Sequence, residues 1–162
     1  MPLFLERNHV LDVFSGTATY KNTFNFSPSH PTDSTSIWLD PGKVEVMVRV
    51  KLNGKDCGIV WEPPYRLNIS NTIRPGKNQL EVDAVNLWIN RMTGDEQVPE
   101  GSEWIDFETL KYWPEWFLKS TQNPSERYTF TNCRHDKKDD IPVPSGLIGP
   151  VQIFTKKNKS YL

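Results

Sequence analysis

The chain has 162 residues and a formal net charge of −1. This length suits one domain with a sizeable core, and the charge gives no electrostatic basis for binding nucleic acid or an anionic membrane. No apolar run approaches the roughly 20 residues of a membrane-spanning helix, and residues 1–7 are too short and too soon charged for a signal peptide. We therefore expect a protein that stays inside the cell or a piece of a larger exported chain.

The first elements alternate between strand and loop. Residues 1–14 are expected to be a segment that leads into the first strand. Over 17–26, apolar residues alternate with Thr, Lys and Asn, the period of two that is typical of an amphipathic strand. Residues 27–36 are rich in Ser, Pro and Thr and predict a loop. A short strand is expected at 37–39, and the Asp-Pro-Gly turn at 40–42 ends it.

The most regular pattern in the chain is the alternation over 44–52, which predicts a long strand with one buried face. Asn53 and Gly54 follow it and tolerate positive φ angles. A two-residue hairpin turn of the primed type requires such angles at both positions. The sequence therefore predicts a β-hairpin that returns through residues 58–61.

Two more strands are predicted after the hairpin. Consecutive prolines at 63–64 cannot donate ladder hydrogen bonds, so the sheet breaks before residues 65–69 resume the alternation. The second long strand covers 80–89, and its apolar pattern changes phase at Val85. Such a change indicates a β-bulge or a strand covered on both faces, and we favour the bulge.

Residues 92–126 form a long irregular excursion, because their glycines and prolines forbid a long helix. A turn or two of helix is expected at 104–110 and at 114–119. A strand is expected to restart over 128–133. An excursion of this length is usually functional or packed over another part of the protein.

The last elements complete an all-β pattern. A final strand is predicted over 151–154, and the basic tail over 156–162 is expected to fray. About eight short strands with turn signals indicate an all-β, antiparallel β-sandwich. We favour a jelly roll, because the first and last strands must pair and long loops interrupt the sheet order. The whole chain, 1–162, is predicted to be a single domain.

A charged segment at 134–140 is one candidate site. Arg134, His135 and Asp136 could bind a polar ligand, and the aspartates could bind calcium, although no EF-hand pattern is present. The alternative is a solvated loop whose opposite charges pair with one another. The two cysteines, Cys57 and Cys133, have neither a metal-ligand spacing nor a disulfide framework, so we expect free thiols. The sequence predicts no metal and no cofactor.

Acidic residues in the excursion offer no identifiable catalytic pair. Glycoside hydrolysis needs two carboxyl groups about 5–10 Å apart. The acids available include Asp95, Glu96, Glu103, Asp106, Glu108 and Glu115. Nothing in the sequence selects a pair, and no nucleophile elbow, phosphate loop or zinc spacing is present. We expect no catalytic residue in this chain.

Aromatic residues gather in the excursion, where Trp113, Trp116 and Phe117 lie close in sequence. Rings flanked by polar groups suit sugars, because a pyranose presents an apolar C–H face and a hydroxyl edge. The alternative is that these rings form a satellite core under a long loop. For Trp61 and Trp88, which stand at predicted strand positions, we favour the core.

Four segments of the chain resemble parts of a known domain. Residues 44–95 read VEVMVRVKLNGKDCGIVWEPPYRLNISNTIRPGKNQLEVDAVNLWINRMTGD, and residues 14–24 read FSGTATYKNTF. Residues 127–140 read RYTFTNCRHDKKDD, and residues 144–153 read PSGLIGPVQI. Together, in this order, they resemble the sugar-binding-like β-sandwich domain of glycoside hydrolases, of family 2 and more closely of family 106 α-L-rhamnosidases.

The resemblance implies a galactose-binding-like jelly roll that is not itself catalytic. In such enzymes the domain packs beside a catalytic barrel and can lend a loop to the rim of the active site. By position, the expected carbohydrate-binding residues are Asn90, Arg91, Asp95, Trp113, Trp116, Arg134, His135 and Asp136. Cys57 and Cys133 depart from the aliphatic or aromatic residues expected there, which leaves the packing detail open.

Three functions follow from these observations. The first is a non-catalytic accessory domain that binds carbohydrate or shapes the substrate cleft of a separate catalytic barrel, in a parent enzyme of the α-L-rhamnosidase or β-galactosidase type. The second is a scaffold module without a sugar ligand, whose aromatic segment contacts that barrel. The third is a small stand-alone hydrolase. The expected partners are carbohydrate and the catalytic barrel of a parent enzyme, and neither nucleic acid nor membrane.

Overall fold

The computed structural model describes residues 13–27, 35–134 and 136–157. The chain divides into two compact units, which are described separately. The first, named the loop unit, contains Met1–Ser15 and Leu87–Val143, and the second, named the sheet unit, contains Gly16–Asn86 and Pro144–Leu162. The prediction of a single domain over 1–162 stays a prediction. No helix in the described parts is long and apolar enough to cross a membrane.

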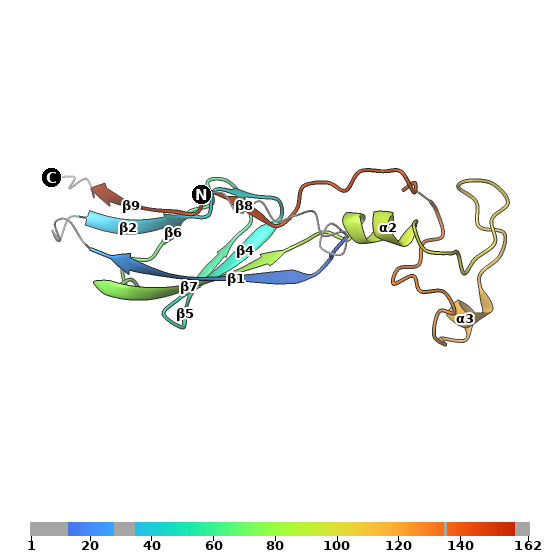
Figure 1. Cartoon of the computed structure of the whole chain (residues 1–162), viewed down its shortest axis with the longest axis horizontal. Helices are drawn as coiled ribbons and strands as arrows, with labels where there is room; N and C mark the ends of the chain where they lie inside the picture. The colour runs from blue at the N-terminus through green and yellow to red at the C-terminus, as the bar shows by residue number, and fades with distance from the viewer. Residues whose placement is uncertain (1–12, 28–34, 135, 158–162) are drawn as a thin grey trace. The chain divides into compact units, whose positions relative to one another are not determined.

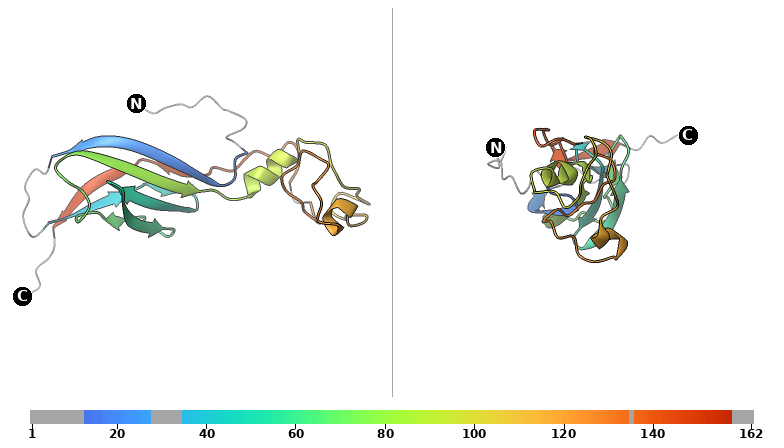
Figure 2. Two further views of the ribbon diagram at one scale, coloured as in Figure 1. Left: turned by 90° about the horizontal axis from the view of Figure 1, so that it is seen from below. Right: turned by 90° about the vertical axis from the view of Figure 1, so that its right-hand side faces the viewer.

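The sheet unit is built from antiparallel strands in layers (Figure 1). One sheet has the order β1-β7-β4-β5, and the second has the order β6-β2-β9, while β3 pairs with β8. Figure 2 shows β1 and β7 running together along one layer. The described strands are β1 (Thr17–Phe26), β2 (Thr35–Asp40), β3 (Lys43–Val44), β4 (Met47–Leu52), β5 (Lys55–Val60), β6 (Leu67–Asn68), β7 (Gly76–Val85), β8 (Leu147–Gly149) and β9 (Gln152–Lys157). The predicted all-β, antiparallel sandwich is confirmed.

The hairpin between β4 and β5 has the predicted turn. Leu52 pairs with Lys55, so Asn53 and Gly54 are the two loop residues. Both have positive φ angles, 52° and 78°, as the primed turn requires. The long alternating strand is interrupted, however, because β3 ends at Val44 and β4 begins at Met47.

The hydrophobic core lies between the sheets of the sheet unit. Alternate residues of β4 and β7 point into it, and its largest fully buried side chains come from β2, from β4 and from the segment after β6. The buried members are Leu39, Val44, Val48, Val50, Leu52, Val60, Ile69, Leu80, Val82 and Ala84. Because the other residues of β4 and β7 are charged or half-buried, each strand has one wet face, which is the pattern that the period of two predicts.

The phase change at the end of the second long strand is not a bulge. Strand β7 ends at Val85, and helix α2 (Ile89–Asp95) begins four residues later. The apolar residues between them are largely exposed, Leu87 at 54% and Trp88 at 63%. Trp61 is 68% exposed, so the expectation that both tryptophans belong to the core is wrong.

Three local predictions for the rest of the chain have different outcomes. A short helix α3 (Glu115–Leu118) confirms the prediction at 114–119, whereas 104–110 contains an isolated bridge between Trp104 and Leu110 instead of a helix. Residues 128–133 form no strand. Strand β9 continues to Lys157, two residues into the tail that is predicted to fray. Most of the predicted loop, 28–34, lies outside the described residues.

Candidate functional site

The candidate site is in the loop unit, where helix α2 meets residues 122–136. Buried polar side chains fix the helix to the irregular chain around it. The amide of Asn90 donates to the backbone oxygen of Val143 and accepts from its backbone nitrogen, both at 2.8 Å. Asn90 is 1% exposed, so its role in the structure is to bind the backbone rather than to face solvent.

Asp95, at the end of α2, is the centre of the second attachment. Arg91 donates to its Oδ1 from Nη2 at 2.6 Å and from Nε at 3.0 Å. Thr129 donates to its Oδ2 from the backbone nitrogen at 2.6 Å and from Oγ1 at 2.7 Å. Asp95 is 1% exposed, and this set of hydrogen-bond partners offsets the cost of removing its carboxyl group from water.

Arg127 makes a third attachment two residues before Thr129. Its guanidinium donates to the Glu96 carboxylate from Nη1 at 3.0 Å, and to the backbone oxygen of Val98 from Nη2 at 3.0 Å and Nε at 3.1 Å. Both side chains of this ion pair are largely buried. Residues 127 and 129 are therefore both bonded to the end of α2 and the segment that follows it.

Tyr128 lies between these two bonded residues, and its side chain is 80% exposed. The guanidinium carbon of Arg91 is 4.4 Å from the centre of its ring, a cation–π distance. An open hollow of about 660 Å³ borders both residues. Its other lining residues are Val98, Gln122, Asn123, Ser125, Glu126 and Arg127.

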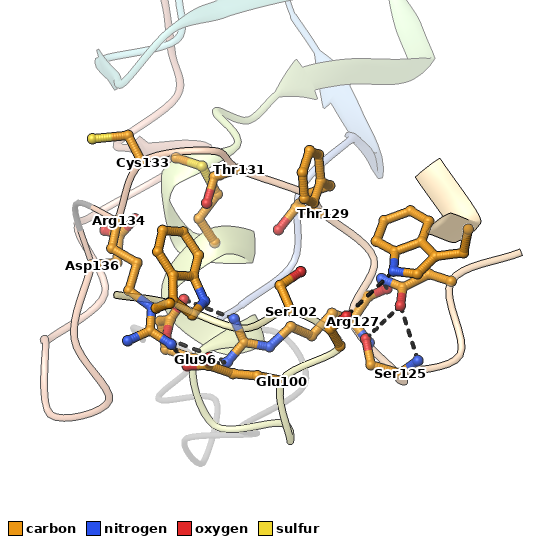
Figure 3. Close-up of a pocket in the computed structure, with 16 residues that line it drawn as sticks. Glu96, Glu100, Ser102, Ser125, Arg127, Thr129, Thr131, Cys133, Arg134 and Asp136 are labelled. Atoms are coloured by element: carbon orange, nitrogen blue, oxygen red, sulfur yellow. Dashed lines mark hydrogen bonds and ion pairs between the residues drawn. The ribbon is translucent and has the colours of Figure 1, made fainter. Parts of the chain in front are cut away.

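A second cavity of the loop unit, beside Arg134, is much smaller (Figure 3). Its volume is about 30 Å³, the space of one or two water molecules, so a sugar ring does not fit. Arg134 is ion-paired with Glu100, and its guanidinium carbon is 4.5 Å from the Trp104 ring centre. Figure 3 shows Arg127 and Arg134 converging on Glu96 and Glu100 at this cavity.

A cluster of four rings forms beside α3. The ring centres of Trp113 and Phe117 are 5.3 Å apart, and Phe117 and Phe130 are 4.6 Å apart. Trp116 packs edge-on against Phe130 at 5.3 Å. Nearly half of the Trp113 and Phe117 surface remains exposed, 48% and 44%. These four residues, named the ring cluster, thus form a satellite core with an open side.

Two acids of the excursion have environments that favour the charged form. A hydrogen bond from Lys111, and a second from Tyr112, lower the pKa of Glu103 below its ordinary value. Hydrogen bonds from the backbone of Glu108 and from Thr109 lower the pKa of Asp106. A general acid for glycoside hydrolysis needs a raised pKa instead, so neither acid is tuned for that role.

The structure brings some of the predicted site residues together. Arg91 and Asp95 form an ion pair, Trp113 and Trp116 share the ring cluster, and Arg134 lines the small cavity with Asp136. His135 lies outside the described residues. Asn90 and Asp95 are buried, so of the predicted residues on α2 only Arg91 borders the open hollow. The carbohydrate-binding role of the set stays a prediction.

Sequence reasoning missed Tyr128 and Arg127. Tyr128 and Phe130 alternate with polar residues, a pattern that indicates a strand. In a strand the two rings would lie on the same face, so the pattern gives no sign that Tyr128 is exposed by itself. The bonds that hold this segment come from α2 and the chain after it, about 30 positions earlier. Such long-range side-chain bonds leave no signal in local periodicity. Cys57 and Cys133 are free, as expected.

Comparison with known proteins gives the family. Residues 3–123 match the family described as "Glycosyl hydrolase 2 galactose-binding domain-like". This chain belongs to that family. The resemblance seen in the sequence is confirmed, and the sandwich is a galactose-binding-like domain of glycoside hydrolases.

Two relatives cover nearly the whole domain. A protein of Formosa agariphila named "Putative beta-glucuronidase" is 42% identical over 157 residues, 94% of this chain. The structure of a rhamnosidase from Novosphingobium sp. PP1Y matches 93% of this chain with 31% identity and a TM-score of 0.70. A β-glucuronidase of Bifidobacterium dentium matches 91% at 15% identity and a TM-score of 0.53, which shows the fold alone.

The matches are short compared with these relatives. This chain spans 13% of the Formosa protein, 12% of the Novosphingobium chain and 22% of the Bifidobacterium chain. The galactose-binding-like domain is therefore a small part of each larger protein that it matches.

Proposed function

We propose that this galactose-binding-like domain is a non-catalytic accessory domain that flanks the substrate cleft of a glycoside hydrolase and contacts carbohydrate through its loop unit. The observation that carries the proposal is the open hollow beside Arg91. Its walls combine amide, hydroxyl and carboxyl groups with one exposed ring, and sugar sites use this mixture. The relatives support the setting, since their names include a rhamnosidase and a putative β-glucuronidase.

Calorimetric titration tests carbohydrate contact directly. The 162-residue chain is titrated with rhamnose- and galactose-containing oligosaccharides at millimolar concentration, and weak saturable binding is expected. Replacing Gln122 and Glu126 by Ala removes two exposed polar groups of the hollow and is expected to weaken that binding. A variant with Glu62→Ala, an exposed acid of the sheet unit, is the matched control. No heat with any of these sugars refutes autonomous binding.

The open side of the ring cluster favours a second function, an interface with the catalytic barrel of a parent enzyme. Trp113 and Phe117 leave large apolar surface in solvent, and Leu118 beside them is 67% exposed. Exposed apolar patches on soluble domains commonly mark protein contacts. In this function the domain is a scaffold, and its rings contact protein rather than sugar.

A chimera distinguishes the interface from the sugar site. In the Formosa protein, the matching segment is replaced by this chain, with and without Trp113→Ser and Phe117→Ser. If the rings form an interface, the substituted chimera should unfold at a lower temperature than the unsubstituted one. The change should appear in the unfolding transition that the domain shares with the rest of the Formosa protein. Equal unfolding temperatures with weakened sugar binding would assign the rings to carbohydrate instead.

A further inference from the structure

Tyr128 has an unusual combination of exposure and restraint. Its ring is 80% exposed, yet both chain neighbours are bonded to buried or nearly buried partners. Arg127 donates to Glu96 and Val98, and Thr129 donates twice to the buried carboxylate of Asp95. An exposed ring whose backbone is anchored on both sides loses little freedom when a ligand packs on it.

Arg91 determines which part of the Tyr128 ring is available to a ligand. Its guanidinium lies over the Tyr128 ring at 4.4 Å, while its Nε and Nη2 bind Asp95. The salt bridge fixes the guanidinium, and the guanidinium in turn supports the ring. The remaining ring surface borders the hollow, next to Gln122, Asn123 and Ser125. A pyranose could place its C–H face on the ring and its hydroxyls toward these polar groups.

The charges around the hollow disfavour an anionic ligand. The two cations in its wall are already paired, Arg91 with Asp95 and Arg127 with Glu96. Glu126 adds a carboxylate to the wall, and no ion pair of Glu126 is found among the described residues. Arg127 also lies 3.8 Å from the Glu100 carboxylate, which in turn pairs with Arg134. With these ion-pair partners included, three cations and four carboxylates surround the hollow, so a uronate or sulfate would enter against a net negative charge.

We infer that Tyr128 is the stacking platform of the hollow and that the site takes uncharged sugars in preference to uronic or sulfated ones. The inference rests on the proposed function and gives its ligand class. Arg91 is a positioning residue here, because it acts through Tyr128 and through its bond to Asp95.

A glycan array tests the ligand class. The labelled 162-residue chain is applied to neutral rhamno-, galacto- and xylo-oligosaccharides and to oligogalacturonates, oligoglucuronates and sulfated galactans. Signal confined to the neutral set supports the inference. Signal on the uronate or sulfated set, equal or stronger, overturns the inference and leaves carbohydrate contact standing. Signal on neither set overturns both.

Substitution of Tyr128 tests the platform with the strongest neutral oligosaccharide. Tyr128→Ala is expected to lower affinity about tenfold, the loss of roughly 1.4 kcal/mol of stacking, while Tyr128→Phe keeps the ring and the affinity. Tyr112→Ala, another exposed tyrosine of the loop unit that does not line the hollow, is the control. Thermal unfolding confirms that each variant is folded. Unchanged affinity in folded Tyr128→Ala refutes the platform.

Discussion

Asn78 is a buried polar residue that joins the hairpin turn to the loop before β7. Its amide accepts hydrogen bonds from the Asn53 side chain and the Arg74 backbone, and donates to the backbone oxygens of Arg74 and Gly76. Asn53 also accepts from the backbone of Gln79 and donates to that of Thr72. The turn residue with the required positive φ angle thus has a second role, which is to bind the neighbouring loop.

Replacing Asn78 by Ala is expected to lower the free energy of unfolding by about 2–4 kcal/mol, because several backbone groups lose their partner in a buried place. Asn25→Ala, at an exposed position of β1, is the control and is expected to change it by less than about 0.5 kcal/mol. Urea unfolding followed by tryptophan fluorescence measures both. Equal midpoints for the two variants would contradict the role of the amide.

Gly42 is required for space as well as for its backbone angle. Its φ is +73°, and a Cβ there would be 2.5 Å from the backbone carbon of Gly149, at the end of β8. Gly54 has a similar φ, +78°, with nothing within 4 Å of a built Cβ. Both glycines need a positive φ angle, but only Gly42 lacks space for a Cβ atom.

Comparing Gly42→Ala with Gly54→Ala therefore distinguishes the cost of a positive φ angle from the cost of a steric clash at the Cβ position. Both variants should lose about 1 kcal/mol through the positive φ angle, and Gly42→Ala should lose clearly more because the β3–β8 pairing must shift. Differential scanning calorimetry gives the two unfolding temperatures. A Gly54→Ala temperature at or below that of Gly42→Ala would refute the steric argument.

Among the elements of the sheet unit, β1, β7 and β4 carry a ladder of charges on their wet face. Lys21 pairs with Glu81 at 3.1 Å, and Lys51 bonds both Glu81 at 2.8 Å and Asp83 at 3.1 Å. The strand register places these residues directly opposite or diagonal to one another. Hydrogen bonds from Lys51 and then Lys21 lower the pKa of Glu81, and those from Thr19 and then Lys51 lower the pKa of Asp83.

These shifts predict how stability depends on pH. Carboxyl groups with a lowered folded-state pKa stabilise the fold above their unfolded values, and this contribution is lost as the pH falls through the folded values, below about 4. The pKa of Lys51 is raised by its bonds to Glu81 and Asp83, so its contribution is lost above about pH 10.

Lys51→Met should reduce both the loss of stability at low pH and the loss of stability at high pH. Lys77→Met, which changes an exposed lysine of β7 for which no ion pair is described, should leave the profile unchanged. Urea midpoints measured from pH 2.5 to 7 and at high pH test this. The expected effect is modest, because the ladder faces solvent, and identical profiles for the two variants would refute it.

Across the chain, the hydrophobic core and the candidate site belong to different units. All ten buried residues of the core cluster lie in the sheet unit. The loop unit is held instead by bonds of buried polar residues and by the ring cluster. Binding residues are commonly found in loops rather than in a hydrophobic core.

The sheet unit should therefore fold without residues 87–143. A variant that joins Asn86 to Pro144 through a short Gly-Ser linker is expected to keep a β-type circular dichroism spectrum and a cooperative thermal transition, because every core residue is retained. The same variant with Leu52→Asp, which buries a charge in the core, should not fold. A shortened chain without a cooperative transition would show that the core needs the loop unit.

Local sequence pattern was enough to predict the sandwich and the hairpin, whereas the family came from a resemblance carried by four segments of the chain. Alternation, turn glycines and prolines are local properties, and the period of two over β4 requires one buried face whatever its partner is. The same patterns showed that residues 92–126 contain little regular structure.

The end of β7, the exposure of Trp61 and Trp88, and the surroundings of Tyr128 came only from the folded structure. An apolar run has the same appearance in a strand and at the start of a helix, so local pattern did not separate β7 from α2. The bonds of Arg127 and Thr129 join residues about 30 positions apart. Such contacts arise from chain packing, which is why the hollow beside Arg91 became visible only in the folded protein.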